Sequence, residues 1–125
     1  MSSTTDRNKI NLNEKFGMFH EHWTPKIVAE LNGQQVKLAR IMGEFVWHAH
    51  EAEDELFLVV RGSFVMEFRD RSITLGEGEL IVVPKGVEHR PVAREEAWVM
   101  LFEPAATLHT GNVVHPLTQT ELEKI

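Results

Sequence analysis

Turn-forming residues interrupt the chain at short intervals from residue 26 onward, which leaves room only for short strands. Asn32-Gly33 is a favoured pair for a two-residue β-hairpin, and Pro84-Lys85-Gly86 marks a further turn. Residues 64–69 alternate with a period of two, as a strand with two different faces does. The pattern predicts strands at residues 26–31, 35–41, 45–50, 55–61, 64–69, 72–75, 80–83, 89–92 and 97–102.

Closely spaced strands without helix-length apolar periodicity between them favour an all-β antiparallel sandwich or barrel. We expect one short helix at the end of the chain, where Thr118-x-x-Glu121 has the spacing of a capping box before Leu122. The polar residues 1–15 are expected to form an irregular arm. At 125 residues, the chain has the length of one domain.

Composition excludes several classes of function. The net charge is −6, and no cluster of Lys and Arg exceeds a pair, so neither nucleic acid nor a membrane surface is an expected partner. The longest apolar run, residues 97–102, is too short to span a bilayer, and residues 1–13 lack the apolar stretch of a secretory signal. We therefore expect a cytoplasmic protein. The chain has no cysteine, so any metal ion must be held by nitrogen and oxygen ligands.

Two predicted strands are apolar on both faces. In residues 55–60, Phe57 and Val59 share one face, while Leu56, Leu58 and Val60 share the other, and residues 97–102 behave in the same way. A two-layer domain in which one face of each sheet is exposed to solvent does not need this pattern. A homodimer interface explains it, and this is the explanation we favour. Cover by the N-terminal arm and a thickly covered single fold are the alternatives.

Three histidines and a glutamate have the spacing of a metal site. His48 and His50 share one face of a predicted strand, Glu55 begins the next strand, and His89 follows the turn at residues 84–86. By itself, a His-x-His pair in a strand is more often two polar or partly buried histidines. With Glu55 and His89, the set suits one divalent transition-metal ion (Zn, Mn, Fe, Ni, Co or Cu) better than Ca or Mg. Four protein ligands would leave two positions of an octahedral ion open.

The same residues resemble the two cupin motifs. GEFVWHAHEAEDELFLVVRG, residues 43–62, is similar to G-x5-H-x-H-x(3,4)-E-x6-G, with Gly43 one residue closer to the first histidine than usual. GELIVVPKGVEH, residues 78–89, is similar to the second motif, G-x5-P-x-G-x2-H-x3-N, whose final Asn falls on Ala93. The resemblance covers about residues 26–103. It implies a double-stranded β-helix (jelly-roll) cupin barrel there, with residues 1–25 as an N-terminal arm and residues 104–125 as a short C-terminal segment. It also implies metal ligation by His48, His50, Glu55 and His89, and a dimer.

Other residues are weaker candidates for the site. One of Glu51, Glu53 and Asp54 could replace Glu55 as ligand, although a solvated acidic loop is the favoured interpretation. His20 and His22 form a second possible metal-binding pair, and His109 and His115 lie in the C-terminal segment, which could cover the mouth of the barrel. Arg40, Arg61 and Arg90 could each bind an anionic substrate. The candidates for lining a pocket are Met66, Phe68, Met100 and Phe102. Glu88, beside His89, is expected at the surface. Ordinary surface or core positions are favoured for all of these.

Two hypotheses of function follow. The first is a metalloenzyme, dioxygenase- or isomerase-like, that acts on a small organic molecule at the centre of three His and one Glu; the reaction types are those that the resemblance implies. The second is a non-enzymatic cupin that binds or senses a small ligand. The sequence names no catalytic acid or base. A sugar-phosphate reaction would need Arg or Lys residues beside the metal, and no spacing in the chain demonstrates such a cluster.

Overall fold

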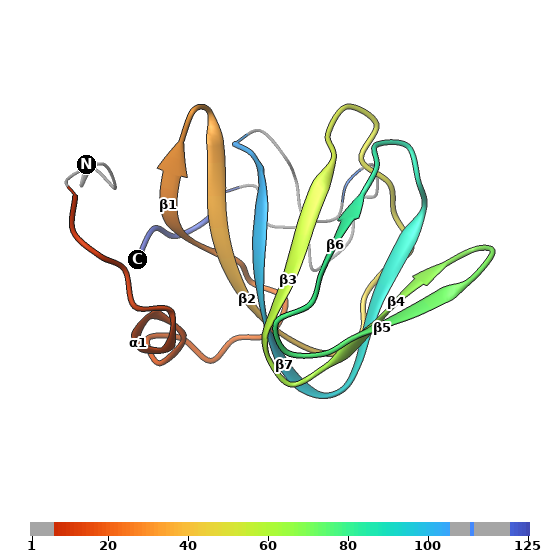
Figure 1. Ribbon diagram of the computed structural model, residues 1–125, viewed down its shortest axis with the longest axis horizontal. Coiled ribbons are helices and arrows are strands. Elements are labelled where there is room, and N and C mark those ends of the chain that lie inside the picture. Colours follow the sequence, from red (N-terminus) through yellow and green to blue (C-terminus); the bar gives the residue numbers. More distant parts are fainter. Residues whose placement is uncertain (1–6, 106–110, 112–120) are drawn as a thin grey trace.

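Seven strands, all paired antiparallel, make up the fold in the computed structural model, which describes residues 7–105, 111 and 121–125 (Figure 1). One short helix, α1 (Leu12–Phe16), precedes them. The strands are β1 (Lys26–Leu31), β2 (Gln34–Glu44), β3 (Glu55–Arg61), β4 (Phe64–Phe68), β5 (Ser72–Leu75), β6 (Leu80–Val83) and β7 (His89–Pro104). The expected all-β jelly-roll barrel is therefore confirmed.

Strand β7 joins the two layers of the barrel. The strand order is β1-β2-β7-β3-β6, and β4 pairs with both β5 and β7. The first part of β7 pairs with β4, where His89 lies opposite Phe68, and the last part pairs with β3, where Phe102 lies opposite Leu56. Strand β2 pairs along the other edge of β7 for almost its whole length. Because β7 changes partner along its course, the sheet bends around a core.

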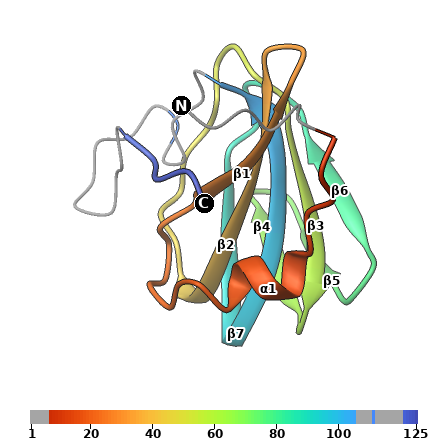
Figure 2. The same ribbon diagram turned by 90° about the vertical axis from the view of Figure 1, so that its left-hand side faces the viewer.

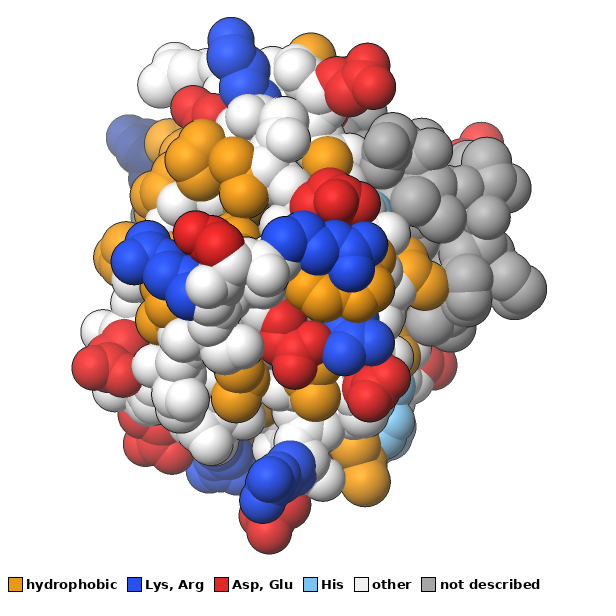
Figure 3. Space-filling model, turned by 90° about the vertical axis from the view of Figure 1, so that its right-hand side faces the viewer, with side chains coloured by type: hydrophobic (Ala, Val, Ile, Leu, Met, Phe, Trp, Pro, Cys, Tyr) orange, Lys and Arg blue, Asp and Glu red, His pale blue; other side chains and the backbone are white. Residues whose placement is uncertain are grey.

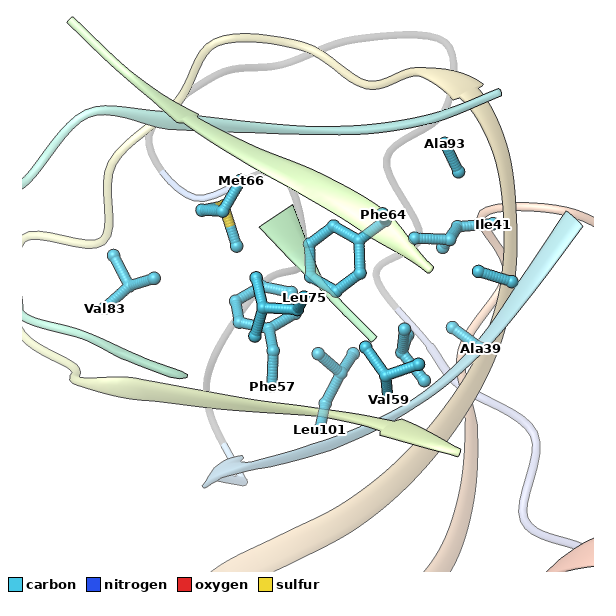
Figure 4. Close-up of a cluster of buried hydrophobic side chains, with 12 residues drawn as sticks. Ala39, Ile41, Phe57, Val59, Phe64, Met66, Leu75, Val83, Ala93 and Leu101 are labelled. Atoms are coloured by element: carbon cyan, nitrogen blue, oxygen red, sulfur yellow. The ribbon is translucent and has the colours of Figure 1, made fainter. Parts of the chain in front are cut away.

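Apolar side chains of both layers meet inside the barrel. Figure 4 shows Phe64, Met66 and Leu75 from β4 and β5 facing Phe57 and Leu101 from β3 and β7. Each of these side chains is at most 6% exposed. Burying a side chain of this size contributes about 1.5–3 kcal/mol to folding. The inward phase of each strand thus supplies the packed core that holds the site in place.

A second apolar cluster covers the outside of the sheet. Helix α1 begins after Asn11, whose side chain accepts a hydrogen bond from the backbone N–H of Glu14, and it brings Phe16 onto the sheet (Figure 2). Phe16 stacks on Trp98 of β7, with ring centroids 4.7 Å apart, and Phe19 is buried beside it. The N-terminal residues therefore account for part of the second apolar phase of residues 97–102. The homodimer stays a prediction.

Three sequence-based expectations about the strands were wrong. Residues 45–50 form no strand: after a β-bulge between Ile41 and Gly43, whose φ is positive (83°), the ladder of β2 with β7 continues only as far as Glu44. The strands expected at 89–92 and 97–102 are one continuous strand, β7, because β2 pairs with both parts. Strand β2 itself is longer than the expected 35–41.

The predicted terminal helix is absent from the described residues. Thr118 lies outside them, and residues 121–125 lie beside β1. There the N–H of Ile27 donates to the carbonyl of Glu123, and the N–H of Ile125 donates to the carbonyl of Ile27. Within the described parts of the chain, no helix is long and apolar enough to cross a membrane. Figure 3 shows acidic and basic side chains interspersed over one face of the molecule.

Candidate metal centre

The four residues of the predicted site lie together at one end of the barrel. His48 and His50 come from the loop between β2 and β3, Glu55 is the first residue of β3, and His89 is the first residue of β7. One possible ligand atom of each lies within 4.8 Å of those of the other three, and all four side chains are buried. The structure thus brings together residues that are up to forty-one positions apart (48 to 89).

Backbone pairing holds this loop in place although it is not a strand. His48 and His89 form an isolated β-bridge, with N–O distances of 3.1 and 2.9 Å, and their rings lie 4.2 Å apart. The N–H of Gly86 donates to the carbonyl of His50 over 2.8 Å. These backbone contacts with His89 and with Gly86 of the preceding turn hold His48 and His50 close to His89. The loop therefore keeps its position without a regular β-ladder.

Gly111 lies against the same loop. A Cβ atom at this position would overlap the carbonyl oxygen of Ala49 and would lie 3.1 Å from Cδ2 of His48. Gly111 also has a positive φ of 58°, which favours glycine. Only glycine allows this close approach of two backbones, so the C-terminal part of the chain touches the metal centre at least at Gly111.

Two of the imidazoles are oriented by their own backbone. Nδ1 of His48 lies 2.9 Å from the carbonyl oxygen of Val46, and Nδ1 of His89 lies 2.9 Å from that of Val87. A carbonyl oxygen only accepts, so each Nδ1 carries the proton and donates it. The lone pair of each ring is then on Nε2, which is the form that a metal ion requires.

Several buried polar atoms in the cluster lack a hydrogen-bond partner. They are Nδ1 and Nε2 of His50, Nε2 of His89 and Oε1 of Glu55. Oε1 of Glu55 lies 3.0 Å from Nε2 of His50 and 3.6 Å from Nε2 of His89, but neither contact has the direction of a hydrogen bond. Burying unpaired polar atoms is costly, and a shared cation compensates for it. The donor set therefore fits a divalent transition-metal ion.

Burial also sets the protonation of the first histidine. It lowers the pKa of His48 to about 4, and the electrostatic influence of the neighbouring His89 ring lowers it further. His48 is consequently neutral at neutral pH and ready to act as a ligand. For Glu55, burial raises the pKa, but the nearby side chains of Glu103, His50 and His89 stabilise its charged form, and this leaves the pKa well below its usual value.

A buried ion pair that the sequence analysis did not identify lies behind Glu55. Nζ of Lys37 is 2.8 Å from Oε1 of Glu103, and the side chains are 1% and 0% exposed. Burial and the charge of Glu55 raise the pKa of Glu103 well above its ordinary value. The two carboxyl groups thus share one proton, and Lys37 balances the remaining negative charge. The available signal was strand phase, because Lys37 shares the inward phase of Ala39, and Glu103 that of Leu101.

An apolar pocket opens beside the cluster. His48 and Glu55 are its only polar lining residues in the described chain. The other lining residues are apolar or aromatic: Trp23, Pro25, Ala39, Ile41, Phe45, Phe57, Pro91, Val99 and Leu101. Its free space is about 400 Å³, including the part open to solvent. The pocket therefore lies directly beside two of the four residues of the cluster.

The weaker sequence candidates lie elsewhere. Asp54 accepts a hydrogen bond from the N–H of Lys85, Glu51 is exposed, and Glu53 is half-buried outside the cluster. None of the pocket-lining candidates lines this pocket: Met66 is in the core, and Phe68, Met100 and Phe102 are half-buried elsewhere.

Ion pairs engage the charged candidates outside the centre. His22 is 2.7 Å from Glu96, and Glu88 pairs with Arg69 at the surface. His20 is exposed and lies outside the cluster. His109 and His115 lie outside the described residues.

Comparison with known proteins identifies the same segment. The family model described as "Cupin domain" matches residues 38–104. A crystal structure of a cupin-2 domain protein from Shewanella frigidimarina is 52% identical, with a TM-score of 0.75, and the match covers 76% of this chain and 93% of that one. A structure from Neisseria meningitidis is 34% identical, with a TM-score of 0.72 and coverage of 78% and 100%. The uncharacterized protein YdbB of Bacillus subtilis is 38% identical over 64 residues, which span 50% of this chain but only 57% of YdbB.

Proposed function

This chain belongs to the cupin family, and from that premise we propose that it binds one divalent transition-metal ion through His48, His50, Glu55 and His89. The observation that carries the proposal is the set of buried nitrogen and oxygen atoms that converge without hydrogen-bond partners. Three neutral imidazoles and one carboxylate suit Zn, Mn, Fe, Ni, Co or Cu.

We further propose that the centre is that of a metalloenzyme, dioxygenase- or isomerase-like, for a small organic molecule. A bound ion would act there as a Lewis acid on an oxygen atom of the substrate. The chain itself orients His48 and His89 through the carbonyls of Val46 and Val87, and it surrounds the adjacent pocket with apolar side chains. The same fold, at 16% identity and a TM-score of 0.70, occurs in a hydroquinone 1,2-dioxygenase in complex with Fe³⁺.

Metal analysis of purified variants tests the proposal. Wild-type protein loaded with each candidate ion should hold about one ion per chain after desalting, and His50→Ala or Glu55→Gln should weaken binding at least about tenfold. His22→Ala is the matched control, because His22 pairs with Glu96 at the surface and lies outside the cluster. Equal metal content in wild type and both site variants would contradict the assignment, provided that circular dichroism shows all proteins folded.

A non-enzymatic ligand-binding or sensing cupin is the alternative. The two functions differ in one observation, because a binder retains a copurified small molecule unchanged, whereas an enzyme converts it when the metal is present. Turnover that disappears in Glu55→Gln while the fold is kept would favour the enzyme.

We also propose that the chain forms a homodimer. Leu80 and Val82 of the edge strand β6 are 56% and 49% exposed, which is an apolar edge that a second copy could cover. Sedimentation of wild type and Val82→Lys tests this, and a monomeric wild type would refute it. A cytoplasmic location and the division into residues 1–25, 26–103 and 104–125 remain predictions.

A further inference from the structure

The pocket beside the metal centre selects what can bind there. We infer that the part of the substrate that extends from the metal into this pocket is small, apolar and uncharged. This inference rests on the proposed function. Apart from His48 and Glu55, every described lining residue is apolar or aromatic. The substrate then reaches the ion with a polar head and places an apolar tail among these side chains.

Two stacked aromatic rings form one wall of the pocket. Trp23 and Phe45 lie 4.6 Å apart with an interplanar angle of 21°. The only polar atom of the Trp23 side chain, Nε1, donates to the carbonyl of Met42 over 2.9 Å. Phe45 meets the ring of His48 edge-on at 5.4 Å. This wall consequently offers the substrate an apolar surface. The N–H of the Trp23 ring is already used in its hydrogen bond to Met42.

Four basic side chains of β2, β3 and β7 are engaged elsewhere. Arg40 donates to Glu96 and to the carbonyl of Phe16, Arg61 lies over the Trp98 ring, and Lys37 pairs with Glu103.

Arg90 pairs with Glu67 and Glu44. None of these cations lines the pocket. Among the described residues, a carboxylate or phosphate placed in the pocket would meet no cationic side chain, and the loss of its water there is strongly unfavourable.

The size of the pocket limits the tail. The centre of a water-sized sphere can move through about 30 Å³. A single water molecule needs about 10–15 Å³ by this measure, so there is room for roughly two water-sized groups. An ethyl group matches this space. A phosphorylated or polyhydroxylated sugar exceeds it and also carries polar groups that the walls cannot satisfy.

A pair of probes tests the inference. Both 2-hydroxybutanoate and 2-hydroxysuccinate bind metals through the same hydroxy-carboxylate head, and they differ only by a methyl group replaced with a carboxylate. Calorimetric titration of metal-loaded protein should show 2-hydroxybutanoate binding at least about tenfold more tightly, which corresponds to about 1.4 kcal/mol. Equal affinities, a preference for 2-hydroxysuccinate, or no binding of either probe overturns the inference.

Two variants examine the size of the pocket. Ile41 lines it, so Ile41→Ala should enlarge it and improve binding of the longer 2-hydroxyhexanoate relative to 2-hydroxybutanoate. Ile73→Ala is the matched control, because Ile73 packs on the core without lining this pocket. A similar change in both variants contradicts the proposed location of the tail. If Ile41→Ala does not fold, the wild-type probe pair still decides.

Metal content is measured before each titration. Protein that retains no ion contradicts the proposed function, and this inference fails with it. Protein that holds its ion but shows no preference for the apolar tail contradicts only the inference about the substrate.

Discussion

Acid should destabilise the metal-free protein through His48. Burial lowers the pKa of His48 from 6.5 to about 4 in the folded state, so between these values the unfolded chain binds more protons than the folded one. The free energy of unfolding therefore decreases as the pH falls through this range. With these two pKa values, acidification from about pH 7 to about pH 5 costs about 2 kcal/mol through His48 alone.

Glu103 acts in the opposite direction. Its raised pKa means that the folded state holds a proton that the unfolded state has released. The stability that Glu103 contributes is present below its unfolded pKa and is lost as the pH rises through the folded one. The total pH dependence therefore mixes both effects, and only a comparison with a variant without the titrating imidazole isolates His48.

Urea unfolding with a chelator present provides the measurement. Between about pH 7 and about pH 5, wild type should lose about 2 kcal/mol more than His48→Gln. His20→Gln serves as control, since His20 is exposed and lies outside the cluster. Equal losses in wild type and His48→Gln would refute the reasoning, because His48 would then not be held neutral by burial.

Three further perturbations follow from the packing. Lys37→Met leaves the carboxyl of Glu103 buried without its cation and should lower the free energy of unfolding by about 3–5 kcal/mol, whereas Lys37→Met with Glu103→Leu should recover most of it in urea titrations. Gly111→Ala places a Cβ atom against the carbonyl of Ala49 and should weaken metal binding several-fold by calorimetry; unchanged binding would show that this contact does not support the centre. Phe16→Ala removes a buried ring from Trp98 and should cost about 3–5 kcal/mol in unfolding followed by tryptophan fluorescence, and a loss below about 1 kcal/mol would mean that α1 does not stabilise the sheet.

The sequence predicted the elements that local chemistry determines. Strands β1, β3, β5 and β6 have the expected bounds and β4 ends one residue earlier than expected, because turn residues separate these strands. Helix α1 was not predicted because its five residues are too few for a helical period, and the packing of Phe16 against the sheet stabilises it. The continuity of β7 depends on its partner β2, which lies far away in the sequence.

The same distinction holds for the site. The motif spacing identified the four residues of the cluster, and the structure brings them together. It did not identify the pair of Lys37 and Glu103 behind Glu55, nor the wall formed by Trp23 and Phe45. These contacts depend on which strands face each other across the barrel, and no local pattern encodes that.

The pairing of β7 has a consequence for how the molecule folds. The β1–β2, β3–β6 and β4–β5 pairs can form without β7. The barrel closes when β7 pairs with β2, β3 and β4. Such non-local pairing makes for slow folding. Because His89 is the first residue of β7, the metal centre is completed in that same step. The rate at which a refolding chain acquires its metal should therefore report the rate of barrel closure.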